Sequence, residues 1–194
     1  MLRTIAERIS TQISGITQKV IPLAKQLTNS DGKTFPAIYK GQGQYSEISP
    51  DNYAGLCYIR QTSSTVISEN NELKRAMNDV SDYRYNLRLV ACIKNSVFGS
   101  DDSFTSDVVA LSLVKLINDS DFSLKADLNA NFASVKAVSY NTDVKNILTK
   151  EYSGIDRLKN SVPYDFTLIA IDIEVIVTIS SNCIELLCKS YCND

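Results

Sequence analysis

One alternating apolar run near the C-terminal end of the sequence, residues 164–180, constrains the fold more than any other feature. Apolar side chains stand at its odd positions: Ile169, Ile171, Ile173, Val175, Val177 and Ile179. Because successive strand residues point to opposite faces, the run predicts a strand with one continuous apolar face. At about 3.3 Å per residue it is roughly 50 Å long, whereas a domain of this size is only about 30–40 Å across. We therefore expect the strand either to bend or to project toward a neighbouring subunit.

The segments around this strand predict an α+β fold. Apolar residues three and four positions apart predict an N-terminal amphipathic helix: Leu2, Ile5, Ile9, Ile13 and Ile16. A second, broadly apolar helix over residues 108–117 is expected to lie across a sheet, largely buried. Alternation predicts strands at residues 83–93 and 132–140, and Ser139 is expected to share a face with Val135 and Ala137. This order favours one mostly antiparallel β-sheet flanked by two main helices, within a single domain of residues 1–194.

The first half of the chain predicts turns, short strands and an extended segment. Residues 29–33 carry a turn signal, and residues 35–40 predict a short strand. Pro22 favours an edge strand or a turn, because proline cannot donate to a strand ladder. We interpret residues 41–82 as an inserted loop, arm or hairpin. The later part of this insertion either forms a hairpin followed by a short helix or becomes ordered only against a partner.

Composition excludes several classes of function. The chain has 20 Lys and Arg residues against 22 Asp and Glu residues, a balance that argues against a nucleic-acid-binding protein. It contains no histidine, which removes most metal sites and the Ser-His and Cys-His nucleophile systems. The sequence contains no run of about 18 apolar residues, the length that would predict a membrane span. The N-terminal helix could lie on a membrane surface or pack on its own domain, and its weakly basic polar face favours packing.

Two carboxylates of the long strand are the first candidates for chemistry. Asp172 and Glu174 lie two positions apart and therefore point the same way. They could bind a cation or act as an acid–base pair. They could equally form a charged strand face that deters aggregation, and this interpretation is favoured.

The five cysteines are the second candidates. Cys57 and Cys92 stand in apolar runs and are expected in the core. Cys183, Cys188 and Cys192 lack the spacing and the fourth ligand of a zinc site, so we interpret them as reduced thiols. Cys188 lies beside a lysine, but no general base accompanies it. The sequence thus predicts no catalytic residue, no metal and no cofactor.

Four tyrosines, Tyr39, Tyr45, Tyr53 and Tyr58, fall within one short stretch around the expected arm. Tyrosine is favoured at protein interfaces because it buries area and keeps a polar tip. Base stacking is the rival use. Because the stretch carries little positive charge, a protein partner is the preferred interpretation.

Six landmarks then follow one another along the chain. They are the N-terminal helix, residues 35–39, the alternating strand 85–90, the apolar helix 108–117, residues 151–154, and residues 164–166 entering the long strand. This order resembles the tail-terminator or tail-completion proteins of tailed bacteriophages, in the broad sense that includes neck ring proteins. The Asn- and Ser-rich chain with its Cys-bearing tail is similar to versions from phages of Bacteroidetes-type hosts, including the crAss-like group. The resemblance covers most of the chain.

The resemblance implies a tail-terminator-like α+β fold and a non-enzymatic virion structural protein of the neck or tail, assembled in the host cytoplasm. It implies a homo-oligomeric ring of six or twelve copies that contacts portal, connector or tail proteins. Genome DNA would pass through the ring without sequence-specific recognition, and no membrane is involved. The candidate subunit-interface residues are Tyr39, Tyr45, Tyr53, Tyr58, Phe166, Asp172 and Glu174.

Two other hypotheses stay open. One is a small carboxylate- or metal-dependent enzyme that uses Asp172 and Glu174. The other is a ring or binding module of a phage-derived secretion machine, which fold alone cannot separate from a virion ring.

Overall fold

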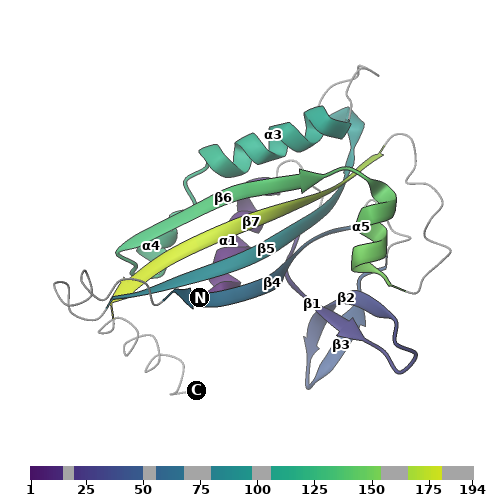
Figure 1. The fold of residues 1–194 in the computed structure, drawn as a ribbon, viewed down its shortest axis with the longest axis horizontal. Helices are drawn as coiled ribbons and strands as arrows, with labels where there is room; N and C mark the ends of the chain where they lie inside the picture. The colour runs from purple at the N-terminus through teal and green to yellow at the C-terminus, as the bar shows by residue number, and fades with distance from the viewer. Residues whose placement is uncertain (15–19, 50–55, 68–79, 98–105, 154–165, 181–194) are drawn as a thin grey trace.

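The computed structural model describes residues 1–14, 20–49, 56–67, 80–97, 106–153 and 166–180. In these ranges the chain forms four α-helices and one seven-stranded sheet in the order β3-β2-β1-β4-β5-β7-β6 (Figure 1). β1 and β4 run parallel, and the other neighbouring strands run antiparallel. The predicted α+β class with a mostly antiparallel sheet is confirmed, while the tail-terminator likeness stays a prediction.

Four long strands make up one half of the sheet. They are β4 (Cys57–Ile67), β5 (Val80–Lys94), β7 (Phe166–Ser180) and β6 (Phe132–Asn141). All 15 residues of β7 pair with β5, and β6 pairs with β7 on its other side. β7 is therefore an internal strand of a twisted sheet, accompanied by its neighbours, and it does not project as a separate ribbon.

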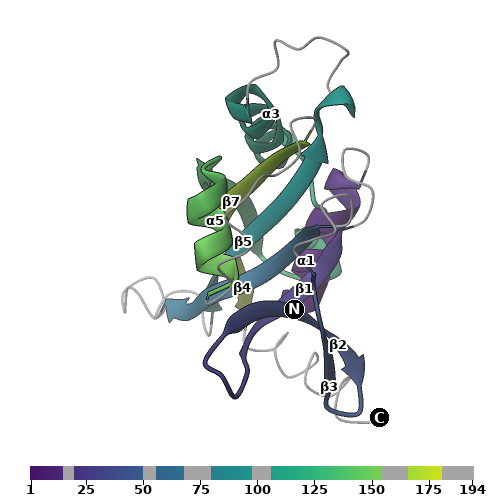
Figure 2. The same ribbon diagram turned by 90° about the vertical axis from the view of Figure 1, so that its right-hand side faces the viewer.

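Three shorter strands make up the other half. β1 (Ile21–Thr28), β2 (Thr34–Gly41) and β3 (Gln44–Glu47) turn away from the long strands (Figure 2). β1 as a whole is an internal strand between β2 and β4, but β2 pairs with Lys25–Thr28 only, so the prediction that Pro22 marks an edge holds for the first part of the strand. The ladder to β4 is irregular between Ile21 and Ala24, so the missing proline N–H falls where the pairing is already interrupted.

One face of the sheet carries the larger core. α1 (Leu2–Ile13), α3 (Ser106–Asp119) and α4 (Leu124–Asp127) pack there against the odd-numbered residues of β7. Ile5, Ile9 and Ile13 are fully buried, which confirms that the N-terminal helix packs on its own domain. Burying each such side chain contributes about 1.5–3 kcal/mol. The prediction that the second helix is largely buried is wrong: α3 buries Val109, Ala110, Leu113 and Ile117 on one face, while Leu111 on the other is 52% exposed.

The other face is covered at one end by α5 (Val144–Glu151), which lies on the opposite side of the sheet from α1 (Figure 2). The Asp143 carboxylate caps this helix by accepting the Asn146 N–H at 3.0 Å. Ile147 and Leu148 then pack in a second, smaller core cluster with Leu168 and others of the sheet. Further along β7 the same face becomes polar, and the carboxylates of interest lie there.

A bulge in β6 overturns one predicted side-chain direction. The register with β7 shifts between Ala137 and Ser139, so Ser139 leaves the face that it was expected to share with Val135 and Ala137. Its hydroxyl instead donates to Asp172 at 3.0 Å. A single inserted residue reverses every later side chain, and simple alternation in the sequence carries no sign of it.

Candidate assembly surface

β2 and β3 form a hairpin closed by a tight turn. Gly41 pairs with Gln44, and the two residues between them, Gln42 and Gly43, have φ of 50° and 77°. Positive φ at both central residues is typical of the turns that match strand twist, and glycine adopts it without strain. The Gly43 N–H also donates to the Tyr39 hydroxyl at 3.3 Å. A local turn therefore sets the shape of the hairpin.

Two tyrosines stand side by side on this hairpin. Tyr39 and Tyr45 are cross-strand partners, and their ring centroids lie 5.2 Å apart. The Lys25 Nζ lies 5.7 Å from the centroid of the Tyr45 ring, a distance at which a cation is attracted to an aromatic face. Tyr39 is 56% exposed and Tyr45 is 40% exposed. The pair thus presents aromatic surface to solvent, although aromatic burial is a large source of stability.

β3 is an edge strand of the sheet. It pairs with β2 on one side, and all four of its side chains are exposed. Within the described residues no strand pairs with the other side of β3, and an edge of this kind can accept another chain through its backbone groups. Just beyond it the chain is anchored: Ile48 is buried, and its carbonyl accepts the Tyr152 hydroxyl at 2.7 Å. An exposed hairpin on a fixed base is preorganised for binding.

Hydrogen bonds from β1 and β2 also fix the hairpin against the end of α5. The Gln26 side-chain amide donates to the Glu151 carbonyl at 2.9 Å, and the Thr34 and Ser153 hydroxyls lie 2.6 Å apart. Both contacts join the hairpin half of the sheet to the end of α5. The orientation of the tyrosine pair relative to the main sheet is therefore defined.

The other predicted interface residues have different positions. Tyr58 is fully buried, so its prediction as an interface residue is wrong. Its hydroxyl donates to the Glu151 Oε2 at 3.0 Å, and burial, followed by the nearby Glu151 charge, raises its pKa well above the usual value. Phe166 is half-buried and packs against the second core cluster. Tyr53 lies outside the described residues.

A buried ion cluster surrounds Tyr58. The Glu151 side chain is 1% exposed and accepts the Arg60 Nε–H at 2.7 Å. The same carboxylate accepts a second Arg60 N–H at 2.8 Å and lies 3.6 Å from an Arg88 nitrogen. Arg88 in turn makes a bidentate pair with Asp172, at 2.7 and 2.9 Å. Two guanidiniums and two carboxylates thus compensate one another where unpaired charge is costly.

Asp172 and Glu174 therefore lie in ion pairs. Burial opposes ionisation of Asp172, but the hydrogen bonds and charge of Arg88 prevail and lower its pKa. Both Asp172 oxygens accept hydrogen bonds, one of them from Arg88 and from Ser139. Glu174 lies 3.1 Å from the Arg84 Nε. The arrangement supplies charge pairing along a strand face and holds neither carboxylate as an unengaged general base.

Sequence reasoning missed Glu151, Arg60 and the role of Arg88. The sequence singled out Glu151 only as part of the landmark at residues 151–154, and its partner Arg60 is 91 positions away in the chain. No local pattern relates them, because the β1–β4 crossover and α5 bring them together. The one available signal was an arginine next to apolar residues in each strand, Arg60 after Ile59 and Arg88 between Leu87 and Leu89.

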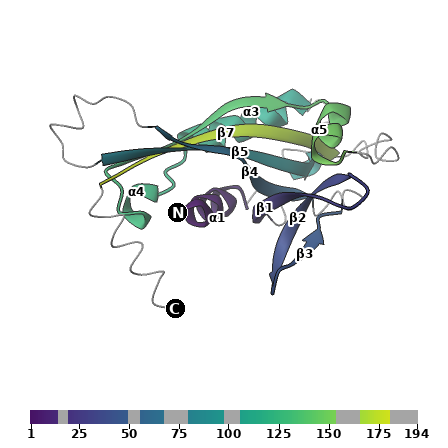
Figure 3. The same ribbon diagram turned by 60° about the horizontal axis from the view of Figure 1, so that its bottom comes forward.

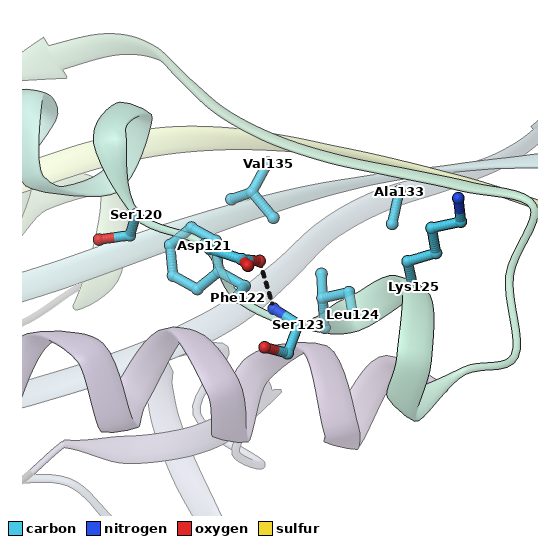
Figure 4. Close-up of a pocket in the computed structure, with 8 residues that line it drawn as sticks. All are labelled: Ser120, Asp121, Phe122, Ser123, Leu124, Lys125, Ala133 and Val135. Atoms are coloured by element: carbon cyan, nitrogen blue, oxygen red, sulfur yellow. Dashed lines mark hydrogen bonds between the residues drawn. The ribbon is translucent and has the colours of Figure 1, made fainter.

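A second feature lies beside β6, the sheet edge opposite β3. The neighbouring helix α4 lies toward the left in Figure 1 and Figure 3, while the hairpin lies below the right half of the sheet. A hollow of about 120 Å³ opens between β6 and the segment around α4. Figure 4 shows Val135 over Phe122 and Asp121, and Ala133 beside Lys125. The Asp121 Oδ1 accepts the Ser123 N–H at 2.8 Å. The lining therefore combines an aromatic floor, a carboxylate and an ammonium group.

The structure also bears on the cysteines, on possible metal sites and on possible membrane-spanning helices. Cys57 and Cys92 are 3% and 6% exposed, which confirms their predicted place in the core. Cys183, Cys188 and Cys192 lie outside the described residues. Across the described parts of the chain, no three His, Cys, Asp or Glu side chains are grouped to hold a metal ion. No helix in those parts has both the length and the apolar character to cross a membrane.

Comparison with protein families and with curated proteins gives no relative. The chain matches no protein-family model, and no curated protein matches it. Any assignment of function therefore rests on the residues and their arrangement.

Proposed function

We propose that this chain is a non-enzymatic structural protein that assembles with copies of itself, as a ring of the neck or tail of a tailed bacteriophage. The resemblance in landmark order supports the phage assignment. The exposed Tyr39–Tyr45 pair on the edge hairpin carries the proposal of assembly. Exposed paired aromatics on an anchored edge strand are typical of a surface that a partner covers.

The geometry favours a head-to-tail contact. The hairpin carries β3, one edge of the sheet, and β6 is the opposite edge (Figure 1). A contact between two different surfaces of identical subunits closes into a ring when the rotation between them allows it. A two-fold dimer uses the same surface on both subunits, so a contact between two different sheet edges is better suited to a ring.

The carboxylate-enzyme hypothesis has less support. Asp172 and Glu174 are the residues it would use, and each is engaged by an arginine of β5. An acid–base pair needs at least one carboxylate placed to exchange a proton with substrate. The secretion-module hypothesis uses the same assembly surface, so neighbouring coding regions for portal, capsid and tail proteins would distinguish it.

Native mass spectrometry over a concentration series, with negative-stain imaging of the same samples, tests the proposal. We expect closed rings of six or twelve copies. A strict monomer at every concentration, together with absence of the protein from purified virions, would contradict it. Virions that contain the protein while the isolated chain stays monomeric would instead show assembly on a template.

A further inference from the structure

We infer that the hollow beside β6 receives Tyr45 from the hairpin of a second copy of this chain, with Glu47 of that copy placed against Lys125. This inference rests on the proposed function and names the surface that the hairpin binds. The occupant is a second copy because the hairpin carries β3, one edge of the sheet, and the hollow borders β6, the opposite edge, so a chain cannot fill its own hollow with its own hairpin.

The hollow matches a single tyrosine in size and chemistry. Its volume of about 120 Å³ is close to the roughly 150 Å³ apolar cavity that accommodates benzene. Phe122 and Val135 offer contacts to a ring (Figure 4). The Asp121 carboxylate uses one oxygen on the Ser123 N–H and offers the other as an acceptor for a phenol hydroxyl. An amphipathic lining of this kind suits tyrosine, which has an apolar body and a polar tip.

The spacing of charges on the two surfaces is complementary. Tyr45 and Glu47 lie two apart on β3 and therefore share a face, as Ala133 and Val135 do on β6. When β3 approaches β6 in the antiparallel sense, Tyr45 beside Val135 sets Glu47 beside Ala133 and hence beside Lys125 (Figure 4). Glu47 and Lys125 form no ion pair within the described parts of one chain. The proposed contact would bring Glu47 of one copy and Lys125 of the other into an ion pair.

α3 limits the docking to the first part of β6. The Asn118 side chain, at the end of α3, accepts the Ala137 N–H at 2.8 Å. Helix coverage is a common way to protect a sheet edge. Ala133 and Val135, which precede Ala137 in β6, border the hollow instead. The five β6 residues before Ala137 are enough to pair with the four residues of β3.

A charge-reversal cycle tests the pairing. We expect Glu47→Lys and Lys125→Glu each to weaken subunit association by roughly fivefold to tenfold, since each sets like charges together. The double variant should return to within about twofold of the wild type. Asp31→Lys and Lys115→Glu make the same charge changes at exposed positions outside the contact and serve as matched controls. Sedimentation velocity at constant salt measures the association.

Photocrosslinking tests the position of Tyr45 directly. With p-benzoylphenylalanine at position 45 and a mixture of isotopically light and heavy subunits, irradiation should join position 45 to residues 120–125 or 133–135 of another copy. Rings that form normally but crosslink elsewhere, and that ignore the charge reversals, would overturn this docking while leaving the proposed function standing. A wild-type chain that never assembles, alone or in virions, would overturn both.

Discussion

Tyrosines in two regions of one sheet have opposite surroundings. Tyr58 in β4 is fully buried and donates to a carboxylate that two arginines also engage. Tyr39 and Tyr45 in the β2–β3 hairpin contact each other as a tilted pair and remain exposed to solvent. The residue type is the same, and the difference comes from what the topology places around it. A cluster of tyrosines in the sequence therefore identifies candidate interface residues, while the fold determines which of these side chains are exposed.

The two regions also differ in whether their polar and aromatic side chains have partners within the chain. In the long half of the sheet, charges and hydroxyls near α5 have partners within the chain. On the hairpin, aromatic surface is exposed and Glu47 has no ion pair in the described residues. Changes in the first region should act on folding, and changes in the second should act on assembly. Four predictions test this division.

Glu151→Ala should have the largest effect on stability. It leaves the Arg60 and Arg88 guanidiniums buried with less compensation, so we expect a loss of about 3–5 kcal/mol in the free energy of unfolding. Chemical denaturation measures it. Glu7→Ala is the control, because Glu7 pairs with Arg3 at the surface and should cost no more than about 0.5 kcal/mol. Equal losses would mean that the cluster is not a stabilising element.

Asp172→Asn should have a smaller, pH-dependent effect. The folded chain lowers the pKa of Asp172 from its ordinary value of 3.8, so the unfolded chain binds the proton more readily. The stabilisation is therefore present above that value and disappears as pH falls through the folded pKa. Because the side chain is 38% exposed, we expect a loss of only about 1 kcal/mol near neutrality.

Denaturation of the Asp172→Asn variant and the wild type from pH 7 to 2 checks the sign. The difference between the two proteins should shrink toward the acid end. A difference that stays constant with pH would show that the carboxylate charge is not what stabilises the contact.

Tyr58→Phe should cost about 1 kcal/mol, because it removes one donor from the buried Glu151 carboxylate. The folded chain raises the pKa of Tyr58, mainly by burial, so this residue stabilises the fold below its unfolded pKa of about 10. That contribution is lost as pH rises toward the folded value. Tyr45→Phe is the matched control and should leave the unfolding free energy unchanged. Loss of stability in both variants would contradict the division between the two regions.

The smallest effect on stability is expected for the double variant Tyr39→Ser, Tyr45→Ser. Both rings are exposed, so the free energy of unfolding should change by no more than about 0.5 kcal/mol. Circular dichroism during thermal melting of dilute samples measures it. A large destabilisation would assign the pair to the fold of the hairpin instead of to a partner.

Periodic sequence features predicted most of the fold. The alternation in β5 and β7 and the apolar spacing in α1 gave the correct elements and the correct buried faces, because burial acts on every second or every third to fourth residue. The position of β1 inside the sheet and the bulge in β6 were not predictable this way. They depend on which distant strands pair with each other, and the local alternation of apolar residues carries no information about that.

The candidate site was predictable only in part. The tyrosine-rich stretch led to Tyr39 and Tyr45, and it equally led to Tyr58, whose burial follows from β4 lying between β1 and β5. Asp172 and Glu174 were found as a pair, but the arginines that engage them come from another strand. The hollow at Lys125 combines two segments that meet only in the folded chain.

Sedimentation velocity on the wild type and on the Tyr39→Ser, Tyr45→Ser variant, over the same concentrations and with folding verified in each, tests assembly through the hairpin most directly. The account predicts closed multimers for the wild type and folded monomers for the variant. Identical multimers in both proteins would contradict it.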